Sequence, residues 1–276
     1  MNSTDPVKDP WFLPDMTWEE VRSALEHTDL AIIPVGAIEQ HGPHLPLGTD
    51  TFGAFDLARS AAPRARGVVA PVLFAGVSAH HLGFPGTLSL SQETFVTVLL
   101  ETAECLAHHG FRRIALVNGH GGNEVAMAYA AHLITKRTDA VAMLFGITQL
   151  RKIYLSENID KLDIHAGVGE TSSVLASRPH LVKLERARRP ELALRGGQRQ
   201  LLREVRERPE LLSFITTDLP PTDELSDTGV ISLLDPSDAT AELGKCNQEL
   251  FVEALVEFLE IWSERVAKDR EEATMK

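Results

Sequence analysis

The feature that most constrains the fold is a series of short apolar segments that end in polar or glycine-containing loops. Four segments have this character: residues 30–36, 67–74, 113–118 and 140–145. Their apolar character is continuous rather than alternating, which is typical of strands buried on both faces of a parallel sheet. Segments with helical spacing separate them, and strands and helices that alternate in this way form right-handed βαβ units. We therefore predict an α/β fold with a mainly parallel sheet covered on both faces.

The segments between these runs contain recognisable helix signals. The clearest helix begins near Ser91, where Ser89 and Gln92 are placed to form a capping box, and it ends at Gly110. Two more helices are expected, over residues 123–137 and 238–268. No internal repeat or linker divides the chain. We therefore expect one domain over residues 1–276, with its core at about 15–265.

Composition excludes several classes of protein. The chain carries 27 basic and 39 acidic side chains, a net charge of −12, which disfavours a general nucleic-acid binder because phosphate backbones need local positive charge. Two cysteines are too few for a disulfide scaffold or a cysteine-built zinc site, and they fit a reducing compartment. The first residues lack the apolar core of a signal peptide, and no apolar run approaches the ~20 residues that span a membrane. We expect a cytoplasmic protein with neither a membrane nor a nucleic-acid partner.

The first loop that could carry chemistry follows the first predicted strand and contains Glu39, His41, His44 and Asp50. Ligand sites in open parallel sheets lie outside the carboxyl ends of the strands, which is where this loop falls. Glu39 and His41 are two residues apart, so an extended segment projects both side chains to the same side. With Asp50 they offer oxygen and nitrogen donors suited to Zn²⁺ or Mn²⁺. The alternative is a pair of loop residues that only satisfies backbone groups.

Two further loops carry the same residue types. His120 lies between glycines directly after the strand at 113–118, and glycines there permit a close approach of the backbone. The loop from Asp163 to Ser172 contains His165 and then Glu170 at a predicted helix start, where a lone carboxylate would be a capping residue. Three such loops at one sheet edge are difficult to explain by structure alone, so we predict a metal site there.

Other catalytic classes have weaker support. Ser78 is close in sequence to His80 and His81 but lacks the Gly-x-Ser-x-Gly pattern of a nucleophile elbow. Cys105 falls within the predicted helix that starts near Ser91 and is expected in the core. The sequence contains no Gly-x-Gly-x-x-Gly after a strand and no Gly-x-x-x-x-Gly-Lys-Ser/Thr loop, so nucleotide-cofactor enzymes lose support.

The segment around residues 183–210 is basic within an acidic protein, with nine Lys/Arg against five Glu. One interpretation is a solvated helical excursion or a subunit contact. The other is a lid that attracts an anionic substrate. We treat residues 183–228 as an insertion that serves as a lid or an interface.

Taken together, these motifs resemble the creatininase (creatinine amidohydrolase) family. The resemblance rests first on residues 34–50, Pro-Val-Gly-Ala-Ile-Glu-Gln-His-Gly-Pro-His-Leu-Pro-Leu-Gly-Thr-Asp. It continues through residues 83–87, 117–123, 165–172 and 235–244. About residues 15 to 265 are therefore covered, and the first motif is long enough to be specific.

The resemblance implies a three-layer α/β/α sandwich with a binuclear metal centre, in a homohexamer. Carried over by position, Glu39 and His120 bind one ion, His41 binds the other, and Asp50 bridges them, while His165 matches the family's catalytic histidine. The two divalent ions are Zn²⁺ and/or Mn²⁺, with Fe²⁺ also compatible. A metal-bridged hydroxide then attacks the carbonyl of a small cyclic or linear amide, and His165 carries a proton to the leaving nitrogen.

Two positions in the site depart from the family pattern or need an assignment. Part of the family takes its last ligand from a glutamate two residues after the histidine that matches His120, and here that residue is Gly122. Relatives with the same Gly-Gly sequence draw this carboxylate from the Glu-Thr-Ser motif, so the resemblance assigns Glu170. We expect His44, His81 and Tyr154 to bind substrate or to orient groups that do.

The substrate is the least constrained part of the prediction. Residues 146–163 contain no tryptophan, whereas creatininase encloses creatinine with tryptophans from this region, so creatinine is not the expected substrate. Other members of the family act on a short peptide, as in mycofactocin maturation, or on a cyclic ketone of the inosose type. Both remain alternatives to a small amide. A non-catalytic metal-binding subunit is the alternative from a different class.

Overall fold

The structure is a computed structural model that describes residues 9–146, 163–192 and 221–274. Its main sheet has four parallel strands in the order β2-β1-β3-β4. The strands are β1 (Leu30–Val35), β2 (Val68–Val69), β3 (Arg113–Asn118) and β4 (Val141–Gly146). All six residues of β1 are buried, as a central parallel strand requires.

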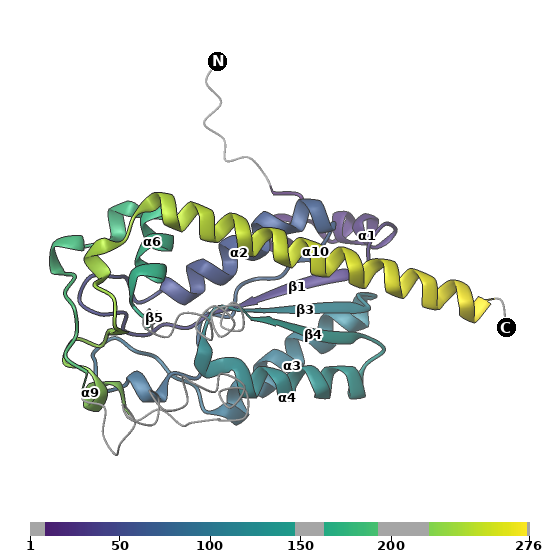
Figure 1. Cartoon of the computed structure of the whole chain (residues 1–276). Coiled ribbons are helices and arrows are strands. Elements are labelled where there is room, and N and C mark those ends of the chain that lie inside the picture. Colours follow the sequence, from purple (N-terminus) through teal and green to yellow (C-terminus); the bar gives the residue numbers. More distant parts are fainter. Residues whose placement is uncertain (1–8, 147–162, 193–220, 275–276) are drawn as a thin grey trace, which may run out of the picture.

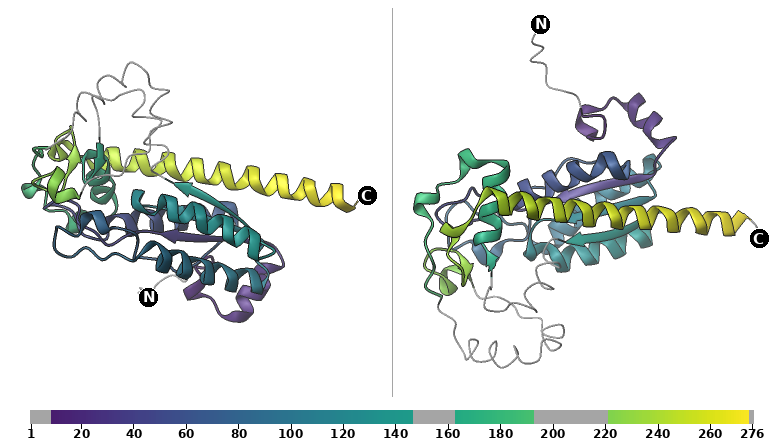
Figure 2. Two further views of the ribbon diagram at one scale, coloured as in Figure 1. Left: turned by 90° about the horizontal axis from the view of Figure 1, so that it is seen from below. Right: turned by 45° about the horizontal axis from the view of Figure 1, so that its top comes forward.

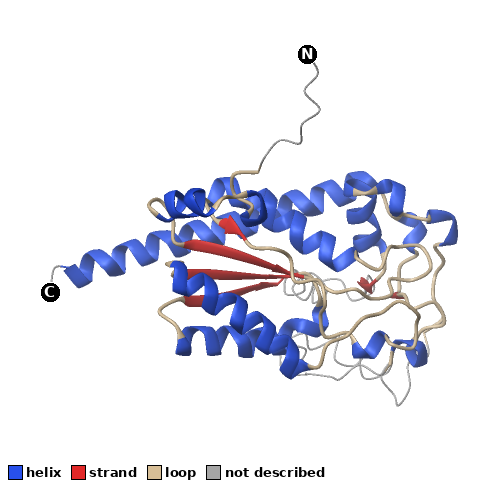
Figure 3. Ribbon diagram, turned by 180° about the vertical axis from the view of Figure 1, so that it is seen from behind, coloured by secondary structure: helices blue, strands red, loops and turns tan. Residues whose placement is uncertain are grey.

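Two helices cover each face of this sheet (Figures 1 and 3). On one face lie α3 (Gln92–His109) and α4 (Glu124–Arg137), and on the other lie α2 (Thr49–Ala65) and α10 (Ala241–Thr274). The two cores follow from the alternation of side chains along a strand. In β1, Ile33 packs in the core with α3 and α4, while Ile32 packs in the core with α2 and α10. The predicted three-layer α/β/α sandwich is confirmed.

The remaining elements gather at one end of the sheet or at its edge. They are α1 (Trp18–Leu25), β5 (Asp163–His165), α6 (Val168–Ser177), α9 (Thr222–Leu225) and β6 (Ile231–Ser232), with β5 and β6 paired antiparallel. Short 3₁₀ helices span Leu13–Asp15, Ala79–His81, Gly121–Asn123, Pro179–Leu181, Leu184–Arg186 and Pro236–Asp238. The long helix α10 packs along both α6 and α2 and extends past the sheet (Figure 2).

Three details of the sequence prediction were wrong. The expected strand at 67–74 is two residues long, followed only by a single bridge between Leu73 and Val35. Ala70 still donates to the carbonyl oxygen of Ile32, but the next donor to β1 is Leu73, to Pro34, so one extra residue interrupts the regular pairing. Helix α3 is capped by Ser91, whose side chain accepts from the N–H of Thr94, and no Ser89–Gln92 capping box forms. Cys105 is exposed on α3 rather than in the core.

The other boundaries agree closely with expectation. The strand at 113–118 is reproduced, α3 ends at Gly110 as its C-cap, and the terminal helix is a few residues longer than predicted. No helix within the described parts of the chain is long and apolar enough to cross a membrane. The single-domain organisation and the cytoplasmic location remain predictions.

Candidate metal centre

Glycines at the carboxyl ends of β1 and β3 bring the start of α2 against the sheet. A Cβ on Gly36 would lie 2.3 Å from the Cα of Thr51, and one on Gly119 would lie 2.4 Å from the carbonyl oxygen of Asp50. Both contacts are shorter than any side chain tolerates, so only glycine allows this approach. The first turn of α2 therefore places the Asp50 carboxylate beside the loops that follow both strands.

Asp50 stands between two histidines. Its Oδ1 is 3.1 Å from His41 Nε2, and its Oδ2 is 3.0 Å from His120 Nδ1. Glu39 adds a second carboxylate on the His120 side, with Oε2 3.2 Å from Nδ1 of that histidine. Glu170 adds one on the His41 side, with Oε2 3.6 Å from His41 Nε2. The five residues predicted as ligands thus form two sets that share Asp50.

These sets have the dimensions of metal sites. The ligand atoms of Glu39, Asp50 and His120 lie within 4.8 Å of one another, and on the other side those of His41 and Glu170 do so together with His165. Both carboxylate oxygens of Glu39 and Oδ2 of Asp50 are buried without a hydrogen bond to any described residue. Buried carboxylate oxygens without a donor are costly unless a cation satisfies them. The residues therefore fit two divalent cations with oxygen and nitrogen ligands.

Main-chain carbonyls orient the histidines. Nδ1 of His41 is 3.1 Å from the carbonyl oxygen of Glu39, and Nε2 of His120 is 3.1 Å from that of Val77. A carbonyl only accepts, so each of these nitrogens carries the proton and the opposite nitrogen is directed at the carboxylates. This arrangement, in which the outer ring nitrogen donates to a backbone carbonyl, is usual for histidines that bind metals.

Electrostatics in the cluster favour positive charge. Burial lowers the pKa of His41, but the Asp50 carboxylate, with Glu170 and Glu39, outweighs burial and raises this pKa to about 9. Burial also raises the pKa of Asp50, yet the two neighbouring histidines hold it well below its usual value. The pKa of Glu39 is raised, chiefly by burial. Without a metal, protons on the histidines balance the carboxylates.

His165 differs from the two histidines that face Asp50. Burial, reinforced by the charge of His41, lowers its pKa to about 3, so the imidazole is neutral. Its Nδ1 is 3.6 Å from Glu39 Oε1, and its ring lies 4.3 Å from that of His41 between centroids. A neutral imidazole at this position can accept a proton from a group held at the carboxylates.

The loop before α6 fixes Glu170. The N–H of Ala166 donates to Glu170 Oε2 at 2.6 Å, and Ala166 adopts a left-handed backbone conformation with φ 51°. Asp163 caps the same helix by accepting from the N–H groups of Val168 and Gly169 at 3.0 and 2.7 Å. The carboxylate of Glu170 is therefore directed at the centre, although it lies in a helix first turn where a capping role was the alternative.

Gly122 has no room for a carboxylate side chain. A Cβ there would lie 2.3 Å from the carbonyl oxygen of Val77 and 2.4 Å from His120 Nε2. The same close packing holds the His120 ring against that carbonyl. The local backbone of this chain therefore sterically excludes a ligand from position 122.

Of the two described residues expected to bind substrate, only His81 lies at the centre. His81 is buried at the centre, with Nε2 3.3 Å from Glu39 Oε1. His44 is buried one layer away, with Nε2 2.9 Å from Thr171 Oγ1, beside Glu170 in the chain. Ser78 is close to His120, with its Oγ 3.2 Å from Nε2. Tyr154 lies outside the described residues, as does most of the basic segment.

Sequence reasoning missed two polar side chains in the centre. Gln40 lies between two predicted ligands, and its amide nitrogen is 2.9 Å from His81 Nδ1. Thr222, from α9 at the end of the 183–228 insertion, reaches the same nitrogen at 2.9 Å. The position of Gln40 inside the Glu-Gln-His motif was a usable signal, whereas nothing in the sequence near Thr222 indicated the contact.

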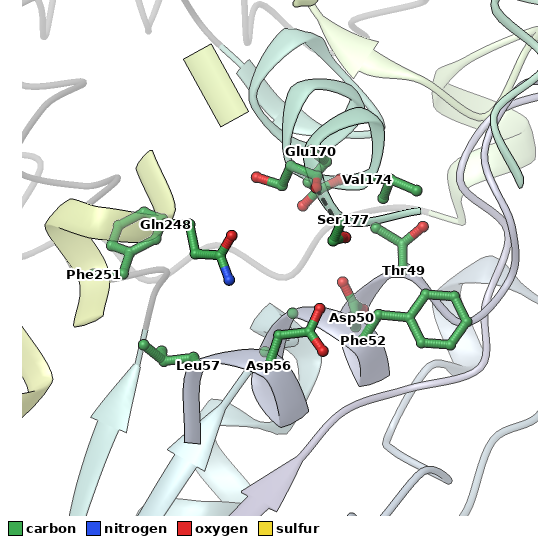
Figure 4. A pocket seen from close by; sticks show the side chains of 13 residues that line it. Thr49, Asp50, Phe52, Asp56, Leu57, Glu170, Val174, Ser177, Gln248 and Phe251 are labelled. Atoms are coloured by element: carbon green, nitrogen blue, oxygen red, sulfur yellow. Dashed lines mark hydrogen bonds between the residues drawn. The ribbon is translucent and has the colours of Figure 1, made fainter. Parts of the chain in front are cut away.

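A cavity lies beside the centre, lined by residues of α2, α6 and α10 (Figure 4). Its volume is about 80 Å³, and its walls include the ligand candidates Asp50 and Glu170. Gly53 on α2 also lines it, and a Cβ on this residue would meet nothing within 4 Å. At the rim, Asp56 forms a two-contact ion pair with Arg178. The cavity thus lies against two of the three carboxylates, those of Asp50 and Glu170.

Comparisons with known proteins agree with this geometry. The profile of the creatininase family, described as creatinine amidohydrolase, matches residues 14–259. The chain is 33% identical over 227 residues to the mycofactocin precursor peptide peptidase of Mycobacterium tuberculosis, covering 78% of each chain. It is 33% identical over 178 residues to the 3-dehydro-scyllo-inosose hydrolase of Thermotoga maritima, covering 62% of this chain and 57% of that one. It is 30% identical over 198 residues to the creatinine amidohydrolase of Pseudomonas putida, covering 63% and 75%.

Not every relative is matched along most of its length. The chain spans just over half the length of the Thermotoga hydrolase and of a mycofactocin precursor peptide peptidase from Mycolicibacterium smegmatis, 57% and 58%. Among solved structures, a crystal structure of creatinine amidohydrolase superposes with a TM-score of 0.72 at 24% identity, over 90% of this chain and 96% of the other. That likeness supports the fold, and the family profile covers most of the sequence. The chain belongs to the creatininase family.

Proposed function

We propose that this protein is a binuclear metal-dependent hydrolase that cleaves a C–N bond in a small cyclic or linear amide. The observation that carries the proposal is the position of Asp50, whose two oxygens face histidines of two different sets. A carboxylate so placed can bridge two cations. The oxygen and nitrogen donors suit Zn²⁺, Mn²⁺ or Fe²⁺, and we propose Zn²⁺ and/or Mn²⁺ as the native ions.

Two divalent ions held in these sets would polarise a carbonyl and lower the pKa of water to about 7. The chain supplies the other functions. One ion would be held by Glu39 and His120, and the other by His41 and Glu170. Asp50 lies between the two sets and would contribute a carboxylate oxygen to each. His165, neutral and directed at the cluster through Nδ1, takes up a proton and returns it to the leaving nitrogen.

The three carboxylates also set the charge of the centre. Glu39, Asp50 and Glu170 together carry three negative charges, so two divalent ions leave an excess of one positive charge, which a hydroxide formed from bound water would neutralise. A centre without net charge suits a neutral substrate such as an amide. The walls of the cavity beside Asp50 mix polar and apolar side chains, which suits a small amide.

Two alternatives use the same centre. The relatives named as an inosose hydrolase and as a peptide peptidase support a cyclic ketone or a short peptide as substrate. We also propose that the protein assembles as a homohexamer. Exposed apolar residues on the edge strand β4, Val141 and Met143, support an assembly, because such edges are normally covered.

Metal content tests the centre independently of the substrate. We expect two ions per chain in the Zn²⁺-loaded protein by elemental analysis, and one in Glu170→Gln, because that carboxylate belongs to a single set. Asp56→Asn is the matched control, since Asp56 lines the same cavity on α2 but pairs with Arg178. Failure of the wild-type protein to take up metal would refute the proposal.

Activity then selects among substrates. The Mn²⁺- and Zn²⁺-loaded proteins should be assayed with formamides, lactams, creatinine, short peptides and inososes. We expect turnover of an amide, lost in His165→Ala with metal content unchanged. Turnover of an inosose or a peptide alone would select an alternative, and bound metal without any turnover would favour the non-catalytic subunit.

A further inference from the structure

The Gln40 side chain makes hydrogen-bond contacts with two histidines and two main-chain groups of the centre. It is buried between Glu39 and His41 in the chain. Its Oε1 accepts from the N–H of Gly42 at 3.0 Å, and its amide nitrogen donates to the carbonyl oxygen of Gly229 at 3.0 Å. These two bonds settle which end of the amide is oxygen and which is nitrogen.

The packing around Gln40 leaves it one orientation. Gly229 has φ +80°, and a Cβ on it would lie 2.0 Å from Gln40 Oε1. The main-chain N–H of Gln40 donates to Thr87 Oγ1 at 3.1 Å, so the backbone is tied as well. The amide is therefore held from both sides and cannot turn over without breaking two hydrogen bonds.

This fixed amide determines the tautomer of His81. The second amide hydrogen of Gln40 can only be donated, and His81 Nδ1 lies 2.9 Å away. Nδ1 must then be the unprotonated nitrogen, which places the hydrogen on Nε2. The protonated Nε2 lies 3.3 Å from Glu39 Oε1 and so faces this predicted ligand. Gln40 thus determines which ring nitrogen of His81 is turned toward Glu39.

The main chain of the same residue determines the tautomer of His165. Nε2 of His165 is 2.7 Å from the carbonyl oxygen of Gln40, and a carbonyl can only accept. The hydrogen is therefore on Nε2, and Nδ1 carries the lone pair. Because Nε2 of His165 carries a hydrogen, it cannot accept from the Gln40 amide nitrogen 3.0 Å away, so the second amide hydrogen is left for His81.

We propose that Gln40 is a positioning residue that holds His81 and His165 as their Nε2–H tautomers, so that His165 presents Nδ1 to the carboxylate cluster. What Nδ1 does there, as proton carrier, rests on the proposed function. The tautomers themselves follow from the hydrogen bonds and require no assumption about the substrate.

Nitrogen-15 NMR of histidine-labelled, Zn²⁺-loaded protein tests the proposal directly, because protonated and unprotonated ring nitrogens differ widely in chemical shift. In the wild type we expect both His81 and His165 to be Nε2–H tautomers. In Gln40→Glu a carboxylate faces His81 Nδ1, so we expect His81 to become the Nδ1–H tautomer. Thr222→Val is the matched control, because it removes the other partner of Nδ1 and leaves Gln40, and we expect no change.

A second readout separates positioning from simple loss of structure. Gln40→Glu should keep two Zn²⁺ per chain, while kcat falls by about 10–100-fold and KM stays within about twofold. An Nδ1–H tautomer of either histidine in the wild type would overturn the proposal, as would an unchanged His81 tautomer in folded Gln40→Glu. The wild-type spectrum decides the point even if the variant does not fold. If the wild-type protein shows the expected tautomers but turns over none of the substrates, the result would instead count against the proposed function.

Discussion

Metal removal should make folding stability depend steeply on pH above neutrality. In the metal-free protein, His41 has a pKa of about 9, compared with 6.5 for an unperturbed imidazole, because nearby carboxylates outweigh the effect of burial. The folded state therefore binds a proton more tightly than the unfolded state does. A group with a raised pKa stabilises the fold fully below its unfolded pKa and loses that contribution as pH rises through its folded pKa.

The magnitude follows from the size of the shift. The difference from 6.5 to about 9 is about 2.5 units at about 1.36 kcal/mol each, so protonated His41 contributes about 3 kcal/mol at low pH. Most of this contribution is lost between about pH 7 and pH 9.5. His120, whose pKa is raised by Glu39 and Asp50 against the effect of burial, adds a loss of the same sign.

Other histidines in the site do not affect this window. His44 and His165 have pKa values lowered by burial to about 4 and about 3. Groups with lowered pKa values stabilise the fold above their unfolded pKa of 6.5, and that stability is lost as pH falls. Above neutral pH they are uncharged in both folded and unfolded chains, so they add no slope there.

Urea unfolding of chelator-treated protein at a series of pH values measures the effect. We expect the free energy of unfolding to fall between about pH 7 and pH 9.5, with a shallower fall in His41→Gln. His132→Gln should reproduce the wild-type slope, because His132 is exposed on α4. Saturating Zn²⁺ should reverse the trend, since metal replaces these protons and binds more tightly as pH rises. A flat or rising curve for the metal-free wild type would refute the reasoning.

Three further predictions concern residues around the centre. Asp163→Ala should destabilise the protein by about 1–2 kcal/mol in urea unfolding, because the first N–H groups of α6 lose their acceptor, and Asp163→Asn should recover part of this. Gly53→Ala should raise the free energy of unfolding by roughly 0.5–1 kcal/mol, since its Cβ enters open space in a helix interior. Gly53→Leu should also fill the cavity and slow Zn²⁺ uptake, measured by stopped flow. Equal uptake rates in the two variants would contradict this. Adding Gly122→Glu to Glu170→Gln should not restore the second ion in elemental analysis, and a return to two ions would show that position 122 can supply a ligand.

The sequence predicted the centre of the sheet well because burial on both faces leaves a plain signal. Residues 113–118 form β3 with the predicted bounds. All six pair in order with the six residues of β1. The segment 67–74 has the same apolar character, but an extra residue between Ala70 and Leu73 interrupts its regular pairing with β1 after Val69. Apolar character alone could not separate a strand from an extended loop that packs beside one.

Some residues of the site are close in sequence and could be predicted together, whereas others meet only in the folded chain. Glu39, His41 and Asp50 could be grouped from sequence because they lie within one loop at a strand end. Gly229 and Thr222 could not, because their contacts with Gln40 and His81 span 189 and 141 residues. Short polar side chains give no periodic pattern, so only the folded arrangement shows that these residues meet.

The position of the last carboxylate shows how backbone packing restricts a shared chemistry. Gly122 allows the backbone to lie against Val77 and His120, and this contact directs His120 at Asp50 while excluding any side chain at 122. The open side of His41 is then filled by Glu170 from α6, which Ala166 directs through a left-handed backbone. Gly122 and Glu170 therefore belong to one arrangement. The packing at Gly122 that orients His120 leaves no room for a carboxylate at that position, and Glu170 supplies one beside His41.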